Sequence, residues 1–203
     1  MEDLLAYLSR DDVPALWQAA IAHAQFESIH PFTDGNGRIG RALVSASLRR
    51  RGVTRHAVIP LASGILARRD DYFDALGEYR MGNPEPVIAL FVRSADVAAM
   101  EARESIERIK ALPDEWAAEV KPRKGSAAAA LLPIFYDHPV LTADEIERLT
   151  GGNTAAMYAA IAKLEEAEVI REITGRRRDR VWAADDLLAE LDDLDRRIQA
   201  AMR

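Results

Sequence analysis

The stretch HPFTDGNGRIGR, residues 30–41, constrains the fold most, because it interrupts a helical pattern that holds on both of its sides. Apolar residues recur at three- and four-residue spacing over 14–29, and again from residue 39 until the chain reaches Gly52. Pro31 disfavours helical geometry in the residue before it, and two glycines follow within a few residues. The sequence therefore predicts two helices that are joined by this loop.

The rest of the first half of the chain is also predicted to be helical. Further helical periodicity covers 70–79 and 86–109. Residues 113–125 then gather two prolines, a glycine and mixed charges, which is typical of a linker. We therefore expect a first domain over 1–112 and a linker over 113–125.

Beyond the linker the pattern changes to helices followed by strands. Three helices are expected, over 127–136, from Thr142 and over 154–166, and two short strands, over 169–173 and 181–183. The segment TGRRRDR between the strands is typical of a hairpin tip. This order resembles a winged helix-turn-helix domain. We therefore expect a mainly α protein, with a helical domain over 1–112 and a small winged helix-turn-helix domain over 126–203 that contains a short β-hairpin and a C-terminal helix.

Composition limits the class of protein. The chain has 203 residues, of which 49% are hydrophobic and 30% charged, no cysteine, and a net charge of -6. These values are typical of a globular protein, exclude a disulfide scaffold and argue against a protein that coats nucleic acid through bulk charge. The longest apolar run, AAAALLPIF, is far shorter than the roughly 20 residues that cross a bilayer, and the acidic N-terminus is unlike a secretory signal. We expect a cytoplasmic protein with no membrane contact.

The loop at 30–41 carries residues suited to binding phosphate. A glycine-flanked turn that opens a helix exposes backbone N–H groups without partners inside the helix, and the positive end of the helix dipole lies there too. Gly35 and Gly37 leave no side chain to block a phosphate, and Asn36 between them can donate to a phosphate oxygen. Arg38 and Arg41 lie on one helix face and can hold two further phosphate groups. The set predicts a polyphosphate ligand.

Two more side chains of the loop suggest metal-assisted chemistry. Asp34 would repel phosphate unless a divalent cation lay between them, and magnesium binds through one carboxylate, phosphate oxygens and water. His30 is the best general base in the group for taking the proton of a hydroxyl. Taken singly, a histidine at a helix end more often caps the helix or packs in the core, and a GNG more often makes a turn. The combination predicts metal-assisted transfer of a phosphorus-centred group.

The same stretch resembles the signature of the Fic family, His-Pro-Phe-x-Asp/Glu-Gly-Asn-Gly-Arg-x-x-Arg, at all nine fixed positions. The preceding FESI and the region down to about residue 109 also look like that family. The resemblance implies transfer of AMP from ATP to a serine, threonine or tyrosine hydroxyl of a target protein, with release of pyrophosphate. Relatives that transfer the γ-phosphate instead have a lysine where this chain has Gly37, so the resemblance favours AMP transfer.

The resemblance also implies a role for each residue of the motif. His30 would deprotonate the target hydroxyl, Asp34 would hold magnesium against the α- and β-phosphates, and Phe32 would anchor the loop in the core. The phosphate-binding residues would be Gly35, Asn36 and Gly37 as an anion hole, and Arg38 and Arg41 at the β/γ end. No motif identifies the base pocket, for which Tyr72 and Tyr79 are candidates.

Two parts that relatives carry are not found in this sequence. A β-hairpin flap that aligns the target precedes the motif in relatives, whereas the 29 residues before His30 have a helical pattern. Many relatives also have an inhibitory helix whose glutamate is followed by glycine or asparagine, and no glutamate of this chain is followed by either. We expect either a fragment of a longer protein or a family member that takes its flap and inhibitor from elsewhere.

The predicted second domain offers candidate DNA contacts. The wing carries Arg176, Arg177, Arg178 and Arg180, and the candidates on the preceding helix are Asn153, Thr154, Tyr158 and Lys163. Residues 113–203 nevertheless hold 13 lysines and arginines against 18 acids, a net charge of -5. Docking onto the catalytic domain, a second copy of the chain or a target protein is therefore favoured over DNA binding. The rival hypothesis is a DNA-binding transcriptional regulator whose Fic domain is a nucleotide sensor or is inactive.

Overall fold

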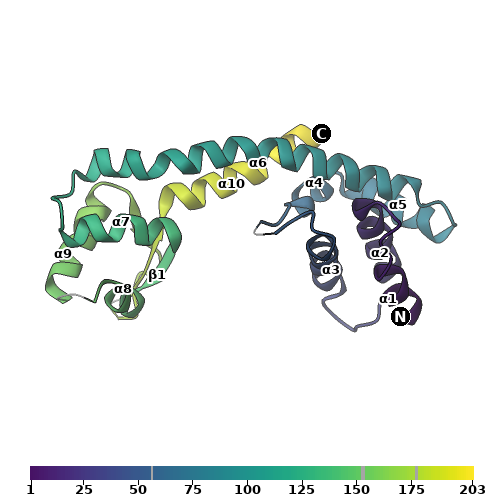
Figure 1. The fold of residues 1–203 in the computed structure, drawn as a ribbon, viewed down its shortest axis with the longest axis horizontal. Helices are drawn as coiled ribbons and strands as arrows, with labels where there is room; N and C mark the ends of the chain where they lie inside the picture. The colour runs from purple at the N-terminus through teal and green to yellow at the C-terminus, as the bar shows by residue number, and fades with distance from the viewer. Residues whose placement is uncertain (56, 152–153, 177) are drawn as a thin grey trace. The chain divides into compact units, whose positions relative to one another are not determined.

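The computed structural model describes residues 1–55, 57–151, 154–176 and 178–203. These residues form a mainly α protein with one small antiparallel sheet, which confirms the expected fold class (Figure 1). They divide into two compact units: Met1–Ala102 together with Asp195–Arg203, called unit 1, and Arg103–Leu194, called unit 2. No helix within the described ranges is long and apolar enough to cross a membrane.

Unit 1 is built from helices. They are α1 (Glu2–Leu8), α2 (Ala15–Ile29), α3 (Asn36–Arg50), α4 (Leu61–Ala67), α5 (Arg69–Arg80), the first part of α6 (Glu85–Val120) and the last residues of α10 (Asp185–Met202). Helices α2 and α3 pack against each other, and the loop of residues 30–35 joins them. Fully buried alanines on α2, such as Ala20 and Ala24, share a core with Val44 and Leu48 on α3. Such small side chains let the two helix axes approach closely.

The connection between α1 and α2 is fastened to the end of α3. Arg51 donates from Nη1 to the carbonyl oxygen of Val13 and to Oε1 of Gln18, each at 2.9 Å. The Gln18 side chain is fully buried and donates in turn to the carbonyl oxygen of Tyr7 at 2.8 Å. The cations at the end of α3 therefore do more than suit the negative end of the helix dipole, because Arg51 also holds the preceding connection in place.

Unit 2 combines helices with the sheet. Its elements are the second part of α6, α7 (Ala127–Asp137), β1 (Val140–Thr142), α8 (Ala143–Thr150), α9 (Thr154–Glu166), β2 (Ile170–Glu172), β3 (Val181–Ala184) and the first part of α10. The strand order is β1-β3-β2 with both pairs antiparallel, so β2 and β3 form the expected hairpin. Trp182 on β3 is fully buried in one core with Phe135, Ile146 and Leu164.

Helix α6 extends into the segment that the sequence assigned to a linker. Residues 113–120 continue the helix, and Pro113 lies inside it with an exposed side chain. A proline within a helix costs about 3 kcal/mol. Trp116 and Val120 are both buried in the core of unit 2, and burial of two large apolar side chains contributes about as much or more. Only residues 121–126 remain as a non-helical connection.

The sequence does not predict α4 or β1, which have seven and three residues and are too short to show a full period. It does predict the start of α8: Oγ1 of Thr142 accepts from the N–H of Glu145, whose side chain accepts from the N–H of Thr142.

The predicted domain boundaries at 112 and 126 differ from those of the compact units, because α6 and α10 both pass from one unit into the other. As functional domains, 1–112 and 126–203 stay a prediction.

Candidate functional site

The loop between α2 and α3 begins and ends with residues in the left-handed backbone conformation. His30 ends α2 with a φ of 48°, and its N–H donates to the carbonyl oxygen of Phe26 at 2.9 Å. Gly35 precedes α3 with a φ of 82°, which a residue with a Cβ adopts only at a cost. Two such turns reverse the chain within six residues, as Pro31 and the glycines predicted. His30 and the N-terminus of α3 therefore lie at the same end of the helix pair.

Asn36 holds this loop together. It is 3% exposed, its Oδ1 accepts from the N–H of Phe32 at 3.0 Å, and its Nδ2 donates to the carbonyl oxygen of Phe32 at 2.6 Å. The side-chain amide of Asn36 thus bonds both the N–H and the carbonyl oxygen of Phe32 and fixes the loop between them. The second hydrogen of Nδ2 is left for another acceptor. A phosphate contact by this side chain stays a prediction, while its structural role is evident from the two hydrogen bonds.

The expected anchoring of Phe32 in the core is wrong. Its side chain is 50% exposed, and its ring centroid lies 6.4 Å from that of Phe26 at the end of α2. Phe32 therefore covers an edge of the helix pair and does not enter the interior. Asn36 fixes the loop through backbone hydrogen bonds, so no buried aromatic anchor is needed.

The N-terminus of α3 has the properties of an anion site. Its own hydrogen bonds begin with the N–H of Ile39 donating to Gly35, so the three preceding N–H groups have no acceptor within the helix. Both arginines of the motif fold back toward the glycines: a Cβ on Gly35 would lie 3.5 Å from Nη2 of Arg38, and one on Gly37 would lie 3.4 Å from Nη1 of Arg41. Backbone donors and two guanidinium groups are therefore gathered around the GNG turn.

Asp34 is 89% exposed and pairs with Arg38, whose Nη2 lies 3.1 Å from Oδ2 of the carboxylate. An exposed pair of this kind is worth about 0–1 kcal/mol, so a ligand that offers a phosphate and a cation can exchange it at little cost. Within the described ranges, no group of three histidine or acidic side chains is placed to hold a metal. Asp34 offers a single exposed carboxylate, a type of ligand that suits magnesium better than zinc.

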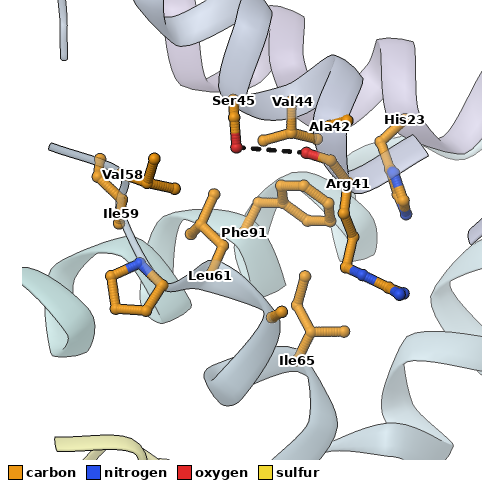
Figure 2. A pocket seen from close by; sticks show the side chains of 12 residues that line it. His23, Arg41, Ala42, Val44, Ser45, Val58, Ile59, Leu61, Ile65 and Phe91 are labelled. Atoms are coloured by element: carbon orange, nitrogen blue, oxygen red, sulfur yellow. Dashed lines mark hydrogen bonds between the residues drawn. The ribbon is translucent and has the colours of Figure 1, made fainter. Parts of the chain in front are cut away.

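Two cavities flank Arg41. One has a volume of about 270 Å³ and is lined by residues of α3, of α4 and of the segment before α4, together with Phe91 of α6 (Figure 2). The other, of about 390 Å³, is lined by α4 and α5, including Tyr72 and Phe73. Both cavities include Arg41 and His23 in their walls. The second is lined by Arg41 and Arg69 together with the aromatic residues Tyr72 and Phe73, a make-up that suits a charged aromatic ligand.

The structure separates the two candidate base contacts. Tyr72 lines the 390 Å³ cavity with Arg41, and burial raises the pKa of its hydroxyl to about 12. Tyr79 lies two turns further along α5, where its hydroxyl donates to Oε1 of Gln25 at 2.8 Å and borders a different cavity of about 220 Å³ with Tyr7. Tyr72 thus shares a cavity with Arg41 of the motif, and the cavity beside Tyr79 is lined by α1, α2 and α5.

Sequence reasoning did not identify His23. The ring is 2% exposed, and its Nε2 lies 3.0 Å from Oη of Tyr72. One signal could have found it, since His23 precedes His30 by seven residues and stands among the alanines of the buried face of α2. A polar residue on such a face, two turns before a functional loop, indicates a specific partner.

The candidate DNA contacts of unit 2 are only partly free. The guanidinium of Arg180 lies 4.7 Å over the ring of Trp182, and its Nη2 lies 3.7 Å from Oε1 of Glu165. Arg176 and Arg178 are exposed, whereas Arg177 and Asn153 lie outside the described residues.

The remaining candidates are on α9. Thr154 donates to Oε1 of Glu147 at 2.7 Å and Lys163 to the carbonyl oxygen of Lys121 at 3.3 Å, while Tyr158 is 43% exposed. Thr154 and Lys163 thus already bind neighbouring groups of unit 2. The surface of α9 therefore offers fewer uncommitted donors than the sequence predicted.

Comparison with known proteins agrees with the geometry of the loop. A sequence model described as the Fic/DOC family matches residues 1–48. The chain is 36% identical over 78 residues to "Protein adenylyltransferase Fic" of Nematostella vectensis, covering 38% of this chain and 17% of that protein. It is 40% identical over 65 residues to a probable protein adenylyltransferase of Aquifex aeolicus (strain VF5), covering 32% of this chain and 18% of the relative. The chain thus spans less than a fifth of these relatives' length.

A structural comparison finds a Fic family protein from Desulfovibrio desulfuricans G20. The TM-score is 0.48 at 21% identity, over 90% of this chain and 53% of that one, and a likeness at this level supports no conclusion about function. The N-terminal region of this chain, which holds the complete motif between α2 and α3, is similar in sequence to proteins of the Fic/DOC family.

Proposed function

We propose that this chain is a protein adenylyltransferase, which transfers AMP from ATP to a serine, threonine or tyrosine hydroxyl of a target protein with the help of magnesium. The observation that carries the proposal is the loop itself. It places a histidine, an exposed carboxylate, an open helix N-terminus and two guanidinium groups within twelve residues. The relatives named as adenylyltransferases match this chain in the same region.

The phosphates of ATP would bind at the start of α3. The N–H groups ahead of Ile39 and the helix dipole favour a negative charge there, and Arg38 and Arg41 add charge-assisted hydrogen bonds. Asp34 would give up its pair with Arg38 and hold magnesium, and the metal would supply charge stabilisation for the leaving pyrophosphate.

His30 would supply the base for the transfer. The imidazole takes the proton of the target hydroxyl while that oxygen forms a bond to the α-phosphorus. The bond between the α-phosphorus and the bridging oxygen breaks, and pyrophosphate leaves with the bonding electrons. The hydrogen bond from its N–H to Phe26 holds the backbone of His30 at the end of α2 nearest to the anion site.

The base of ATP would enter the 390 Å³ cavity beside Arg41. Tyr72 and Phe73 offer aromatic rings, Leu66 and Ile65 offer apolar contacts, and Arg41 links this cavity to the phosphate end. An aromatic ligand group is attracted by such walls through area burial and ring contacts. This arrangement would leave the α-phosphate between the base and the β/γ end, near the start of α3.

The test uses ATP labelled on the α- or the γ-phosphate, incubated with the chain and a protein extract. We expect label from α and not from γ on protein, and we expect His30→Asn to abolish it. Asparagine is preferred to alanine because it tolerates the left-handed backbone that His30 adopts. Arg49→Ala, an exposed residue of α3 outside the motif, serves as the control that keeps activity.

The outcomes separate the hypotheses. Transfer of the γ-label alone would overturn AMP transfer. ATP binding with no transfer of either label would favour the nucleotide sensor of the rival hypothesis.

We also propose that unit 2 is a winged helix-turn-helix module that docks onto protein and not onto DNA. Its order of helices and strands supports the module, and the packing of Arg180 on Trp182 removes one cation from the predicted wing. DNA binding of the full chain at low salt, compared with a variant carrying Arg176→Ala and Arg178→Ala, tests this. Tight binding that these two changes abolish would contradict the proposal.

A further inference from the structure

A buried histidine lies two helical turns before the loop and has no part in the proposed reaction. His23 is 2% exposed on α2, where its buried neighbours Ala20 and Ala24 are small and apolar. Its Nε2 lies 3.0 Å from Oη of Tyr72, whereas its Nδ1 is buried beside the backbone of Gly40 and makes no hydrogen bond of good geometry within the described ranges. A polar ring buried on an otherwise apolar helix face indicates a specific structural role.

The ring of His23 rests on the backbone of α3 directly before Arg41. A Cβ added to Gly40 would lie 3.0 Å from both Cε1 and Nδ1 of His23, and 2.7 Å from Oε1 of Glu27. A Cβ contact of 3.0 Å is tighter than nine in ten real ones, so any residue larger than glycine would require the buried ring to move by a few tenths of an ångström. The position of Arg41, one residue further on, is therefore set partly by the ring against which α3 packs.

The same ring lies where four helices of unit 1 meet. Its centroid is 5.4 Å from that of Phe91 on α6 and 5.9 Å from that of Tyr72 on α5. His23 and Arg41 both line the 270 Å³ cavity, where Figure 2 shows them on the same side, and both also line the 390 Å³ cavity. A change at His23 thus reaches the motif arginine through α3 and the wall of the proposed base site through α5.

The charge state of the ring suits this place. Burial lowers the pKa of His23 below its usual value near 6.5. The imidazole is therefore neutral at neutral pH, and it does not repel the guanidinium of Arg41 that shares its cavities. A neutral ring can accept the hydrogen of the Tyr72 hydroxyl at Nε2.

We propose that His23 is a positioning residue for the nucleotide. Its contact with Gly40 fixes the position of Arg41, and its hydrogen bond to Tyr72 fixes the wall of the base cavity relative to that arginine. This inference rests on the proposed function, because it takes ATP as the ligand. His23 touches no reacting atom and is not a catalytic residue. Its loss should weaken ATP binding, while kcat changes by less than about twofold.

The chain offers a matched pair of hydroxyls for the test. Tyr72 and Tyr79 stand seven residues apart on α5, and each bonds a side chain of α2, His23 and Gln25 respectively. Tyr72→Phe removes the hydrogen bond beside the cavity, and Tyr79→Phe removes an equivalent one away from it. At position 23, glutamine reaches the place of Nε2, whereas asparagine ends near the place of Nδ1.

Titration calorimetry of ATP with magnesium into the full chain gives the dissociation constant of each variant, and the melting temperature without ATP is recorded beside it. We expect His23→Asn and Tyr72→Phe to weaken binding about tenfold, as for the loss of one buried hydrogen bond. The double variant should be no weaker than either single one, because both remove the same bond. His23→Gln and Tyr79→Phe should stay within about twofold of the unchanged chain.

Three results would overturn the inference: equal weakening by Tyr79→Phe and Tyr72→Phe, failure of His23→Gln to restore binding, or unchanged binding by His23→Asn. If His23→Asn does not fold, the comparison of the two tyrosine variants decides. An unchanged chain that binds no ATP overturns this inference and the proposed function together. One that binds ATP but transfers no AMP overturns the proposed function alone, and the binding comparison still stands.

Discussion

The close approach of α2 and α3 predicts opposite effects for one substitution at two helical glycines. Replacing glycine by alanine within a helix gains about 1 kcal/mol of stability from helix propensity. At Gly77 on α5 an added Cβ meets nothing within 4 Å, so the gain should be kept. At Gly40 on α3 the Cβ would lie 3.0 Å from the buried ring of His23 and 2.7 Å from a carboxylate oxygen of Glu27.

The two contacts at Gly40 differ in how easily they yield. Oε1 of Glu27 is the far end of a flexible side chain and can move aside, whereas the ring of His23 is enclosed by Tyr72 and Phe91. Overpacking of a core of this kind costs about 1–3 kcal/mol. After the propensity gain, Gly40→Ala should lower the free energy of unfolding by about 0–2 kcal/mol. The two variants should therefore differ by about 1–3 kcal/mol.

Urea unfolding followed by circular dichroism measures this difference, provided that both variants have the same m value. The melting temperatures should differ in the same sense, by roughly 2–4 °C for each kcal/mol in a chain of this size. If Gly40→Ala stabilised the protein as much as Gly77→Ala, α2 and α3 would have room for a methyl group between them. The packing argument for His23 would then fail with it.

Three further predictions concern separate parts of the chain. Arg51→Ala should lower the free energy of unfolding by about 1–3 kcal/mol, because it removes a donor to the buried side-chain oxygen of Gln18. The control Arg49→Ala should change this free energy by less than about 0.5 kcal/mol. Equal urea midpoints of the two variants would contradict the prediction. Because the pKa of His23 is lower in the folded chain than in the unfolded chain, the unfolded chain takes up the proton at a higher pH. The free energy of unfolding should therefore decrease as the pH falls below about 6.5, the pKa of the unfolded state. Unfolding at pH 7.5 and 5.5 should show a smaller loss in His23→Gln, and an identical loss would count against a buried neutral ring. Thr142→Ala should cost about 1 kcal/mol by removing the cap of α8, and Thr142→Ser should restore the melting temperature.

The parts of the fold that could be predicted depend on local signals. Pro31 and Gly35 mark the loop, Gly52 marks the end of α3, and Thr142 with its acidic first turn marks the start of α8. Each acts through the backbone or a neighbour within a few residues, so its effect does not require knowledge of the fold. Pro113 is the exception, because its local signal is overridden by burial of residues that follow it in α6.

The candidate site divides in the same way. The residue types of the motif could be read from the sequence, because glycines, arginines and a carboxylate imply an anion and a cation wherever they lie together. The structural roles could not, since they depend on which groups become neighbours. Phe32 was expected to be buried and is exposed, while Asn36 is buried and holds the loop. His23 finds its partner 49 residues away on α5, a distance that no spacing rule covers.

The two hydrogen bonds between Asn36 and Phe32 have a consequence for the thermodynamics of ligand binding. Ordering the backbone of one residue costs about 1–2 kcal/mol of conformational entropy. In this loop the conformational entropy is already lost when the chain folds, because the side chain of Asn36 fixes the segment from Phe32 onward. An anion that binds here needs to order little besides the two arginine side chains. The affinity of the site would therefore depend on the stability of the loop, to which the two hydrogen bonds of Asn36 contribute.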